Sequence, residues 1–518
     1  MGRGEKGILR STAVVGAMTA LSRVLGLVRE MFQSRLIGAG VEQSAFALAF
    51  AIPNMMRKLF GEGALTAAFV PVFKGEVEAQ RMESARRLAR AVMTMSLLML
   101  MAVSALAVAG LSVALRWEDA FSERTVLLLR LTRILVPYMV FICGAAFGMG
   151  VLNALGKFAA ASLMPSLLNV VWIVSLGVLC FVPGMSLSSR AVWVSGAILF
   201  AGSLQMAFMF WCMKRRGVSP LPSRAGWRDP NTRLVWRNMF LAAAGAGAVQ
   251  VNYMLDQVLA QAASPWAAGV IGYAERLMDL PLGIVGVAFG TVLLPTFAGC
   301  FAKGDVAGAR RALLASSDKM LFVMIPAAVG LGILAPDVTR VIYEGKAFDA
   351  TATTRVARAV ACYAVGLGFF GMQKTLVPWF QAQKDMRTPL AVSVKMVFLN
   401  ATLNILAVWL LPVDWRHVGL AASTVLCAGV ACVWLAALAC RKNGTLGLAA
   451  LVRPVACTCL ASAAMAAALV FARASLAGFA AARNWNGALS NVAQLAVLVV
   501  LGGAVYFSAM FFLHSRRR

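Results

Sequence analysis

Residues 91–115 have the sequence AVMTMSLLMLMAVSALAVAGLSVAL, and no charged residue lies between Arg90 and Arg116. A helix of about 20 apolar residues is long enough to cross the hydrocarbon core of a bilayer. A helix is also the economical conformation there, because it satisfies its backbone hydrogen bonds within the segment. This stretch therefore predicts a transmembrane helix.

Similar apolar segments recur along the whole chain of 518 residues, which is 61% hydrophobic and only 13% charged. Soluble domains carry about 25% charged residues, so the composition excludes an ordinary soluble enzyme. We expect an all-α polytopic membrane protein with about fourteen transmembrane helices. The predicted segments are 8–35, 44–73, 88–115, 126–154, 158–182, 190–213, 236–262, 268–300, 318–336, 357–382, 388–411, 417–440, 450–472 and 487–513. Segments 44–73 and 268–300 are long and interrupted by charge, so we expect them to be bent or partly interfacial.

The loop charges predict the orientation. The net charge is +27, and most Lys and Arg residues of the short loops fall on one side if the N-terminus is cytoplasmic, as the positive-inside rule requires. Both termini are then cytoplasmic. No basic soluble domain is present that would indicate a nucleic-acid partner. The N-terminal apolar run has no convincing signal-peptidase site and is interpreted as the first membrane helix.

The longest polar connection, 214–237, divides the chain. We expect a first lobe at 1–213, a cytoplasmic linker at 214–235, a second six-helix lobe at 236–440, and two further helices with a cytoplasmic tail at 441–518. The lobes share a short motif, FVPVF at 69–73 and LLPTF at 293–297. An offset of six helices gives both lobes the same orientation, as in transporters built from parallel repeats.

Ionisable residues inside membrane segments are costly and usually face a cavity or a partner. Arg29, Arg57 and Arg276 could together hold a diphosphate, because the planar guanidinium donates two hydrogen bonds to phosphate oxygens. The alternative is that the arginines only pair with carboxylates of the same segments. The candidates for gating or charge pairing are Glu62, Glu275 and Asp279. Arg23 and Arg29 are about 240° apart around a straight helix, so only a bend near Gly26 would aim both inward.

A second polar set comprises Asp256, Asn400, Asn404 and Thr424. One carboxylate with neutral oxygens could bind a small cation such as Na⁺. The favoured interpretation is hydrogen bonding between helices. We predict no cofactor and no structural metal.

Catalytic patterns are almost absent. A rival function, a membrane glycosyltransferase or ligase, would need a general base near the outer face. The sequence offers only His417, expected in a short outer loop, and scattered carboxylates. A lone loop histidine is far more often solvated.

The N-terminal region carries a specific series of residues: SRVLGLVR at 22–29, followed by Ala45-Phe46, Pro53-Asn54, Arg57, Glu62-Gly63-Ala64 and Phe69-Val70-Pro71. Further matches are Leu168-Asn169, YAERLM at 273–278, YEGK at 343–346, and Lys384-Asp385 with Thr388-Pro389. This order resembles the MurJ (MviN) family of lipid II flippases, in the multidrug/oligosaccharidyl-lipid/polysaccharide exporter superfamily, over residues 8 to about 440.

The resemblance implies two six-helix lobes plus two helices, alternating access, and a transporter rather than an enzyme. It implies lipid II as substrate and a cationic cavity with Arg23, Arg29, Arg57 and Arg276, joined by Asn54 and Lys374. Membrane lipids and the peptidoglycan synthesis machinery would be the partners of a monomer. Where the family often has an acidic residue, this chain has Ser44, so a gating role is not transferred there. Coupling to Na⁺ or H⁺ stays open, as does export of another polyprenyl-linked oligosaccharide.

Overall fold

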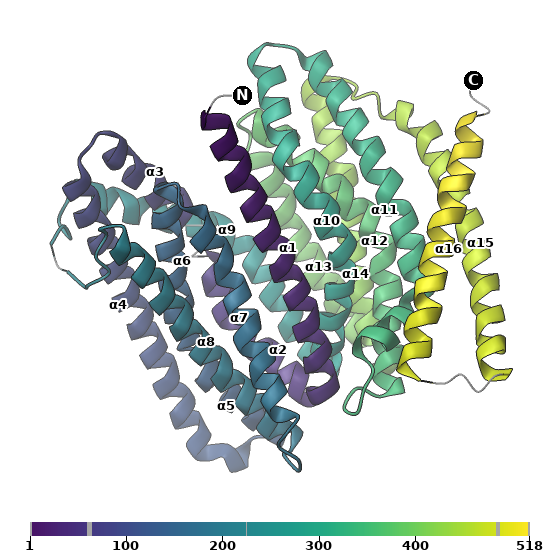
Figure 1. Cartoon of the computed structure of the whole chain (residues 1–518), viewed down its shortest axis with the longest axis horizontal. Coiled ribbons are helices and arrows are strands. Elements are labelled where there is room, and N and C mark those ends of the chain that lie inside the picture. The colour runs from purple at the N-terminus through teal and green to yellow at the C-terminus, as the bar shows by residue number, and fades with distance from the viewer. Residues whose placement is uncertain (1–2, 60–64, 224, 483–486, 516–518) are drawn as a thin grey trace. The chain divides into compact units, whose positions relative to one another are not determined.

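The computed structural model describes residues 3–59, 65–223, 225–482 and 487–515 (Figure 1). Helices account for nearly all of them, and the described residues contain no β-strand beyond an isolated bridge between Gly345 and Phe348. The first helices are α1 (Arg3–Ile37), α2 (Val41–Met56), α3 (Leu65–Glu78), α4 (Met82–Ala114), η2 (Leu115–Ala120), α5 (Glu123–Leu135), α6 (Tyr138–Ala154), α7 (Phe158–Leu179) and α8 (Leu187–Arg215). The remainder are α9 (Pro230–Ala263), α10 (Ala267–Ala302), α11 (Val306–Tyr343), α12 (Ala350–Ala382), α13 (Arg387–Leu410), α14 (Val413–Asn443), η3 (Leu448–Leu451), α15 (Val452–Ala482) and α16 (Ala488–Ser515). The expected all-α class is confirmed.

Every predicted segment corresponds to a helix or to a pair of helices. Segment 44–73 is divided into α2 and α3, whereas segment 268–300 is the single helix α10, which contains two prolines, Pro281 and Pro295. Segment 126–154 was expected to be one helix but is α5 followed by α6. Pro137 lies at that junction. It lacks the backbone N–H that would donate within a continuing helix, although both Val136 and Pro137 keep helical dihedral angles.

Ten helical stretches within the described residues are long and apolar enough to cross a membrane by length and composition. They include Met82–Ala120, which contains the apolar residues 91–115, and the C-terminal Ala488–Leu513. The chain is thus a multi-pass membrane protein. A total of fourteen spans is compatible with this result and stays a prediction.

The chain forms two compact units, residues 1–258 with 345–348 and residues 259–344 with 349–518. In the first, α1 packs along α7 and α6 along α8; in the second, α15 packs along α16 (Figure 1). The core of the first unit includes Phe69 and Phe73, and a core of the second includes Leu293 and Phe297, all nearly inaccessible. The motifs at 69–73 and 293–297 therefore bury side chains at corresponding positions. The assignment of lobes and linker stays a prediction.

Glycines allow α6 and α8 to approach closely in the first unit. A Cβ at Gly202 would lie 2.5 Å from Cδ2 of Tyr138, and one at Gly144 would lie 2.7 Å from Sδ of Met206. A Cβ at Gly148 would lie 2.8 Å from Cβ of Met209. Small residues at such contacts let helix backbones meet where apolar burial supplies little driving force between helices. We call these three glycines the α6–α8 glycine seam.

The connection between α8 and α9 lies against α4. The Ser223 N–H donates to Oγ1 of Thr94 at 3.0 Å, and the Trp227 indole N–H donates to the Ser223 carbonyl at 2.9 Å. The polar segment 216–229 is therefore held on the first unit by its own hydrogen bonds.

The start of α13 explains the motif at Lys384–Pro389. Oδ1 of Asp385 accepts from the Thr388 N–H at 3.0 Å, and Oδ2 lies 2.7 Å from Nζ of Lys442, at the end of α14. The hydrogen bond from Lys442, and then that from the Thr388 backbone, lower the pKa of Asp385 to about 2. This carboxylate caps one helix and ties it to another.

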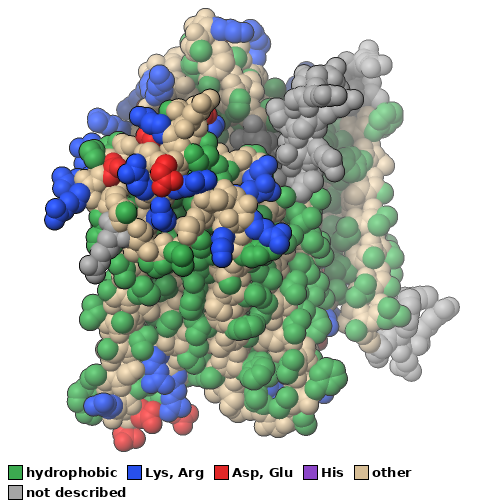
Figure 2. All heavy atoms as spheres, turned by 60° about the vertical axis from the view of Figure 1, so that its left-hand side comes forward, with side chains coloured by type: hydrophobic (Ala, Val, Ile, Leu, Met, Phe, Trp, Pro, Cys, Tyr) green, Lys and Arg blue, Asp and Glu red, His purple; other side chains and the backbone are tan. Residues whose placement is uncertain are grey.

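Figure 2 shows a broad hydrophobic band on the face of the molecule that it draws, with Lys and Arg side chains gathered at one end of it. The connections at that end include the turn between α3 and α4 and the start of α4, where Lys74, Arg81, Arg86 and Arg90 lie. This distribution is typical of a membrane protein with one basic face.

Candidate substrate site

Arg29 is held by three neighbours within the first unit. Its Nη1 donates to Oδ1 of Asn169 at 3.1 Å, its Nη2 is hydrogen-bonded to Glu30, and its Cζ lies 4.3 Å from the centroid of the Trp172 ring. The Arg29 side chain is only 12% exposed. Its Nε is buried and has no hydrogen-bond partner among the residues that the structure describes. A buried guanidinium with an aromatic wall and an unsatisfied donor is well suited to an anion.

Asn169 of α7 connects Arg29 to the backbone of α1, the helix that contains Arg29. Its Nδ2 donates to the Ser22 carbonyl of α1 at 3.0 Å, while its Oδ1 accepts from Arg29. The sequence had singled out Leu168-Asn169 only as a motif. A buried asparagine in the apolar helix α7, three residues before Trp172, is the signal that could have identified it as a partner.

Arg57 follows the last residue of α2, where Oδ1 of Asn54 accepts from both Nε at 3.2 Å and Nη2 at 3.0 Å. The Trp172 ring that lies against Arg29 also packs against Phe50 of α2, with ring centroids 5.6 Å apart, and Phe50 packs against Tyr138 at 6.0 Å. The structure thus pairs Arg57 with Asn54 and gives Arg29 an aromatic wall that the sequence did not predict. A site shared by the two arginines stays a prediction.

Arg23, another predicted residue of this unit, lies apart from Arg29 on α1. Helix α1 runs through Gly26 without interruption, and Arg23 is exposed where Arg29 is mostly covered. This fits the roughly opposite faces expected for positions six residues apart. Glu62 lies outside the described residues. Ser44 is fully buried in α2.

The remaining cationic candidates belong to the second unit. Arg276 and Asp279 are exposed on α10, and the Tyr363 hydroxyl donates to Oε1 of Glu275 at 3.5 Å. Lys374 is exposed on α12. Their membership of one cavity with Arg29 and Arg57 stays a prediction.

The predicted cation ligands make local hydrogen bonds. Nδ2 of Asn404 donates to Oδ1 of Asn400 at 3.0 Å, and both side chains are buried. The Thr424 hydroxyl donates to the Leu420 carbonyl of its own helix at 3.2 Å. In the first unit, Asn252 donates to Oδ2 of Asp256 at 3.1 Å. Each of these hydrogen bonds lies within one helix, so none of them is the contact between helices that the sequence favoured. Both that interpretation and cation binding stay predictions.

His417 differs from its prediction. It is fully buried near the start of α14, where its Nε2 lies 3.1 Å from the Arg355 carbonyl and its ring packs edge-on against Trp266. The expectation of a solvated loop histidine was wrong, because α14 begins earlier than predicted and Trp266 covers the ring. The imidazole is packed as a structural element, which does not suit a general base.

Comparison with known proteins gives consistent results. The sequence profile of the family "Lipid II flippase MurJ" matches residues 33–507. A probable lipid II flippase MurJ of Rhizobium tropici is 33% identical over 406 residues, covering 77% of this chain and 75% of the relative. The lipid II flippase MurJ of Burkholderia cenocepacia is 31% identical over 425 residues, with 80% of each chain covered.

Solved structures share the fold. A lipid II flippase MurJ in an inward-closed conformation matches with a TM-score of 0.77 and 22% identity, covering 98% of this chain and all of the other. A multidrug resistance transporter of the MATE family in the MOP superfamily, inward-facing, matches with a TM-score of 0.67 and 16% identity over 85% of this chain and 99% of the other. The profile match and the two relatives show that the chain belongs to the lipid II flippase MurJ family.

Proposed function

We propose that the protein moves lipid II from the cytoplasmic to the periplasmic leaflet of the bacterial inner membrane. The observation that carries the proposal is the family match over residues 33–507. The buried, aromatic-walled Arg29 supports it, because such a group suits the diphosphate of a lipid-linked precursor. Within this proposal, Arg276, Lys374 and the exposed Arg23 complete a cationic cavity with Arg29 and Arg57.

The physical problem is the headgroup. A sugar-peptide diphosphate cannot enter hydrocarbon without losing its hydration, which costs several kcal/mol for each unreplaced hydrogen bond. A wet cationic cavity replaces those bonds while the polyprenyl tail stays in lipid. The two lobes then alternate between cytoplasmic and periplasmic access, and residues 450–513 form the groove for the tail.

The membrane potential is a sufficient source of work. It supplies about 2.3 kcal/mol per elementary charge per 100 mV, and a negative interior drives an anionic headgroup outward. Coupling to a Na⁺ or H⁺ gradient is the alternative. The protein would act as a monomer with both termini cytoplasmic, alongside the peptidoglycan synthesis machinery.

Transport of another polyprenyl-linked oligosaccharide is the nearest alternative, and a cationic lining disfavours cationic drugs. A transferase function would need an accessible base, whereas His417 is packed under Trp266.

The direct test replaces a depleted host flippase with this chain and measures how much lipid II a periplasmic probe can reach. We expect restored exposure, lost again with Arg57→Ala. Arg130→Ala is the matched control, because Arg130 is 51% exposed and pairs with Glu118 on η2. No exposure from a well-inserted wild-type chain would reject lipid II as the substrate. Full activity of Arg57→Ala would reject the cavity.

A further inference from the structure

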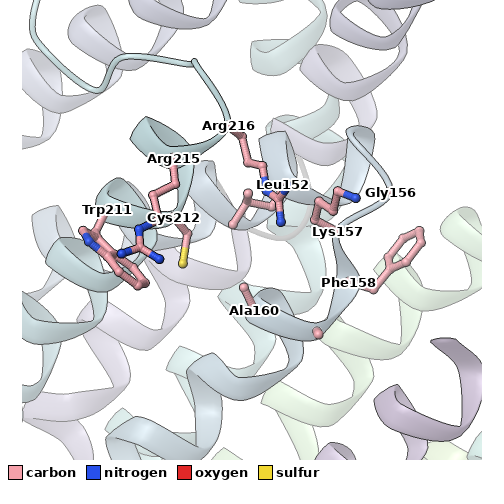
Figure 3. A pocket seen from close by; sticks show the side chains of 10 residues that line it. Leu152, Gly156, Lys157, Phe158, Ala160, Trp211, Cys212, Arg215 and Arg216 are labelled. Atoms are coloured by element: carbon pink, nitrogen blue, oxygen red, sulfur yellow. The ribbon is translucent and has the colours of Figure 1, made fainter. Parts of the chain in front are cut away.

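A second cationic site lies away from Arg29 and Arg57, where α6 ends, α7 begins and α8 ends. A cavity of about 630 Å³ opens there (Figure 3). Its lining includes three cations, Lys157, Arg215 and Arg216, together with Trp211 and Phe158. A cavity of this size is in the range that binds small ligands.

The charges of the cavity are open rather than paired. Within the part of the chain that the structure describes, none of its three cations has a carboxylate within 4.0 Å. Cζ of Arg215 instead lies 4.0 Å from the centroid of the Trp211 ring, and Figure 3 shows the two side chains together on α8, with Arg216 and Lys157 beside the cavity. Three unpaired cations around a hollow attract an anion.

The backbone adds donors to the same cavity. Phe158, Ala159 and Ala160 line it, and they form the first turn of the 22-residue helix α7. The N-cap residue Lys157 makes no side-chain capping hydrogen bond, so its side chain does not occupy the first N–H groups of α7. Gly156, with a φ of +72°, makes the tight turn that places this helix start beside the end of α6. A helix N-terminus with free N–H groups favours phosphate.

The surroundings of the cavity are those of a membrane surface. Trp211 is 50% exposed and Phe158 44% exposed, and aromatic side chains of this kind concentrate at the membrane–water interface. Farther along the two neighbouring helices, exposed apolar side chains continue in the same rows of positions: Leu163, Val170 and Val174 on α7, and Phe200 and Leu204 on α8. A ligand whose phosphate occupies the cavity would thus have apolar surface for attached chains.

We propose that this cavity binds the phosphodiester headgroup of an anionic glycerophospholipid, with its acyl chains along α7 and α8. In the orientation proposed above, the lipid comes from the cytoplasmic leaflet. Basic cavities between membrane helices on that side recognise such headgroups. The lipid would bind independently of lipid II.

The test uses the purified full chain in detergent and native mass spectrometry, with dioleoylphosphatidylglycerol as probe, dioleoylphosphatidylcholine as the zwitterionic comparison, and inorganic phosphate as competitor. The variant carries Lys157→Gln, Arg215→Gln and Arg216→Gln. The matched control carries Lys303→Gln, Arg311→Gln and Arg453→Gln, which remove the same charge from exposed positions of the second unit.

We expect saturable binding of phosphatidylglycerol that weakens on the order of tenfold to hundredfold in the cavity variant and less than about twofold in the control. Equal weakening in both variants would reduce the effect to general charge, and unchanged binding in the cavity variant would remove the site. Displacement by inorganic phosphate at comparable concentration would reassign the cavity to a free anion. If the triple variant does not fold, Lys157→Gln and Arg216→Gln are measured singly with the same criteria. Because lipid II is absent from the assay, the result is independent of the flippase proposal.

Discussion

The first unit holds its cations in two different ways. Arg29 is 12% exposed and is fixed by Asn169, Glu30 and Trp172. Three cations, Lys157, Arg215 and Arg216, line the cavity proposed to bind a phospholipid. They are exposed, and none forms an ion pair among the described residues. A buried charge costs much unless its hydrogen bonds are satisfied, so the first arrangement stabilises and orients one guanidinium. The second creates a local field that a mobile anion can enter. A guanidinium held in one orientation suits a specific substrate, whereas the local electric field of several exposed cations suits an abundant lipid.

The largest effect is expected from Arg29→Ala. Removing one member of a buried polar cluster typically costs about 3–5 kcal/mol, so the unfolding midpoint in detergent should fall and lipid II exposure should be lost. For the stability measurement alone, Arg23→Ala is the matched control on the same helix, because Arg23 is exposed. It should change stability by less than about 0.5 kcal/mol. Equal stability losses in the two variants would show that the neighbours of Arg29 do not stabilise the folded protein more than the surroundings of an exposed arginine do.

Asn169→Ala should be the next largest. It removes the acceptor for Arg29 and the donor to Ser22, and a lost buried hydrogen bond costs about 1–3 kcal/mol. A double-mutant cycle with Arg29→Ala should give a coupling of about 1 kcal/mol, measured by unfolding in detergent. Additive effects would show that the two side chains act independently.

Trp211→Leu tests the open arrangement. It removes the ring under Arg215, a contact worth about 0.5–1 kcal/mol at an exposed site. Phosphatidylglycerol binding should therefore weaken about twofold to fivefold, while the unfolding midpoint stays constant. Trp211→Phe keeps a ring and should retain part of the affinity. A large fall in stability would instead show that Trp211 is part of the core.

The smallest effect is expected from Asp385→Asn. The amide can still cap α13 through Thr388, so only the charge that faces Lys442 is lost. Because the folded state lowers the pKa of Asp385 to about 2, its stabilisation is present above the ordinary pKa near 3.8 and is lost as the pH falls through about 2. Unfolding midpoints of wild type and variant should differ slightly at pH 7 and converge between about pH 4 and pH 2. A difference that persists at pH 2 would assign the effect to capping.

Apolar length and periodicity were enough to place the helices, since each segment must satisfy its own backbone in lipid. Segment 126–154 lies within one apolar stretch, Glu123–Ala154, although Pro137 separates α5 from α6 inside it. Side-chain partners were harder to predict. The Arg29–Asn169 contact spans 140 positions, and no local pattern encodes such a distance. The prediction that His417 is solvated was wrong because Trp266, which covers its ring, lies far away in the sequence.

The α6–α8 glycine seam also constrains the history of the sequence. At Gly144, Gly148 and Gly202, any added side chain would meet atoms of the facing helix or of its neighbours. The sequence can therefore vary on the lipid-facing sides of α6 and α8, whereas a side chain at Gly148 or Gly202 needs a second substitution that opens room on the opposite helix. We expect deep mutational libraries to tolerate almost no single substitution at Gly148, which faces Cβ of Met209, or at Gly202, which faces the Tyr138 ring. Gly144 should be more tolerant, because the flexible Met206 side chain that it faces can move.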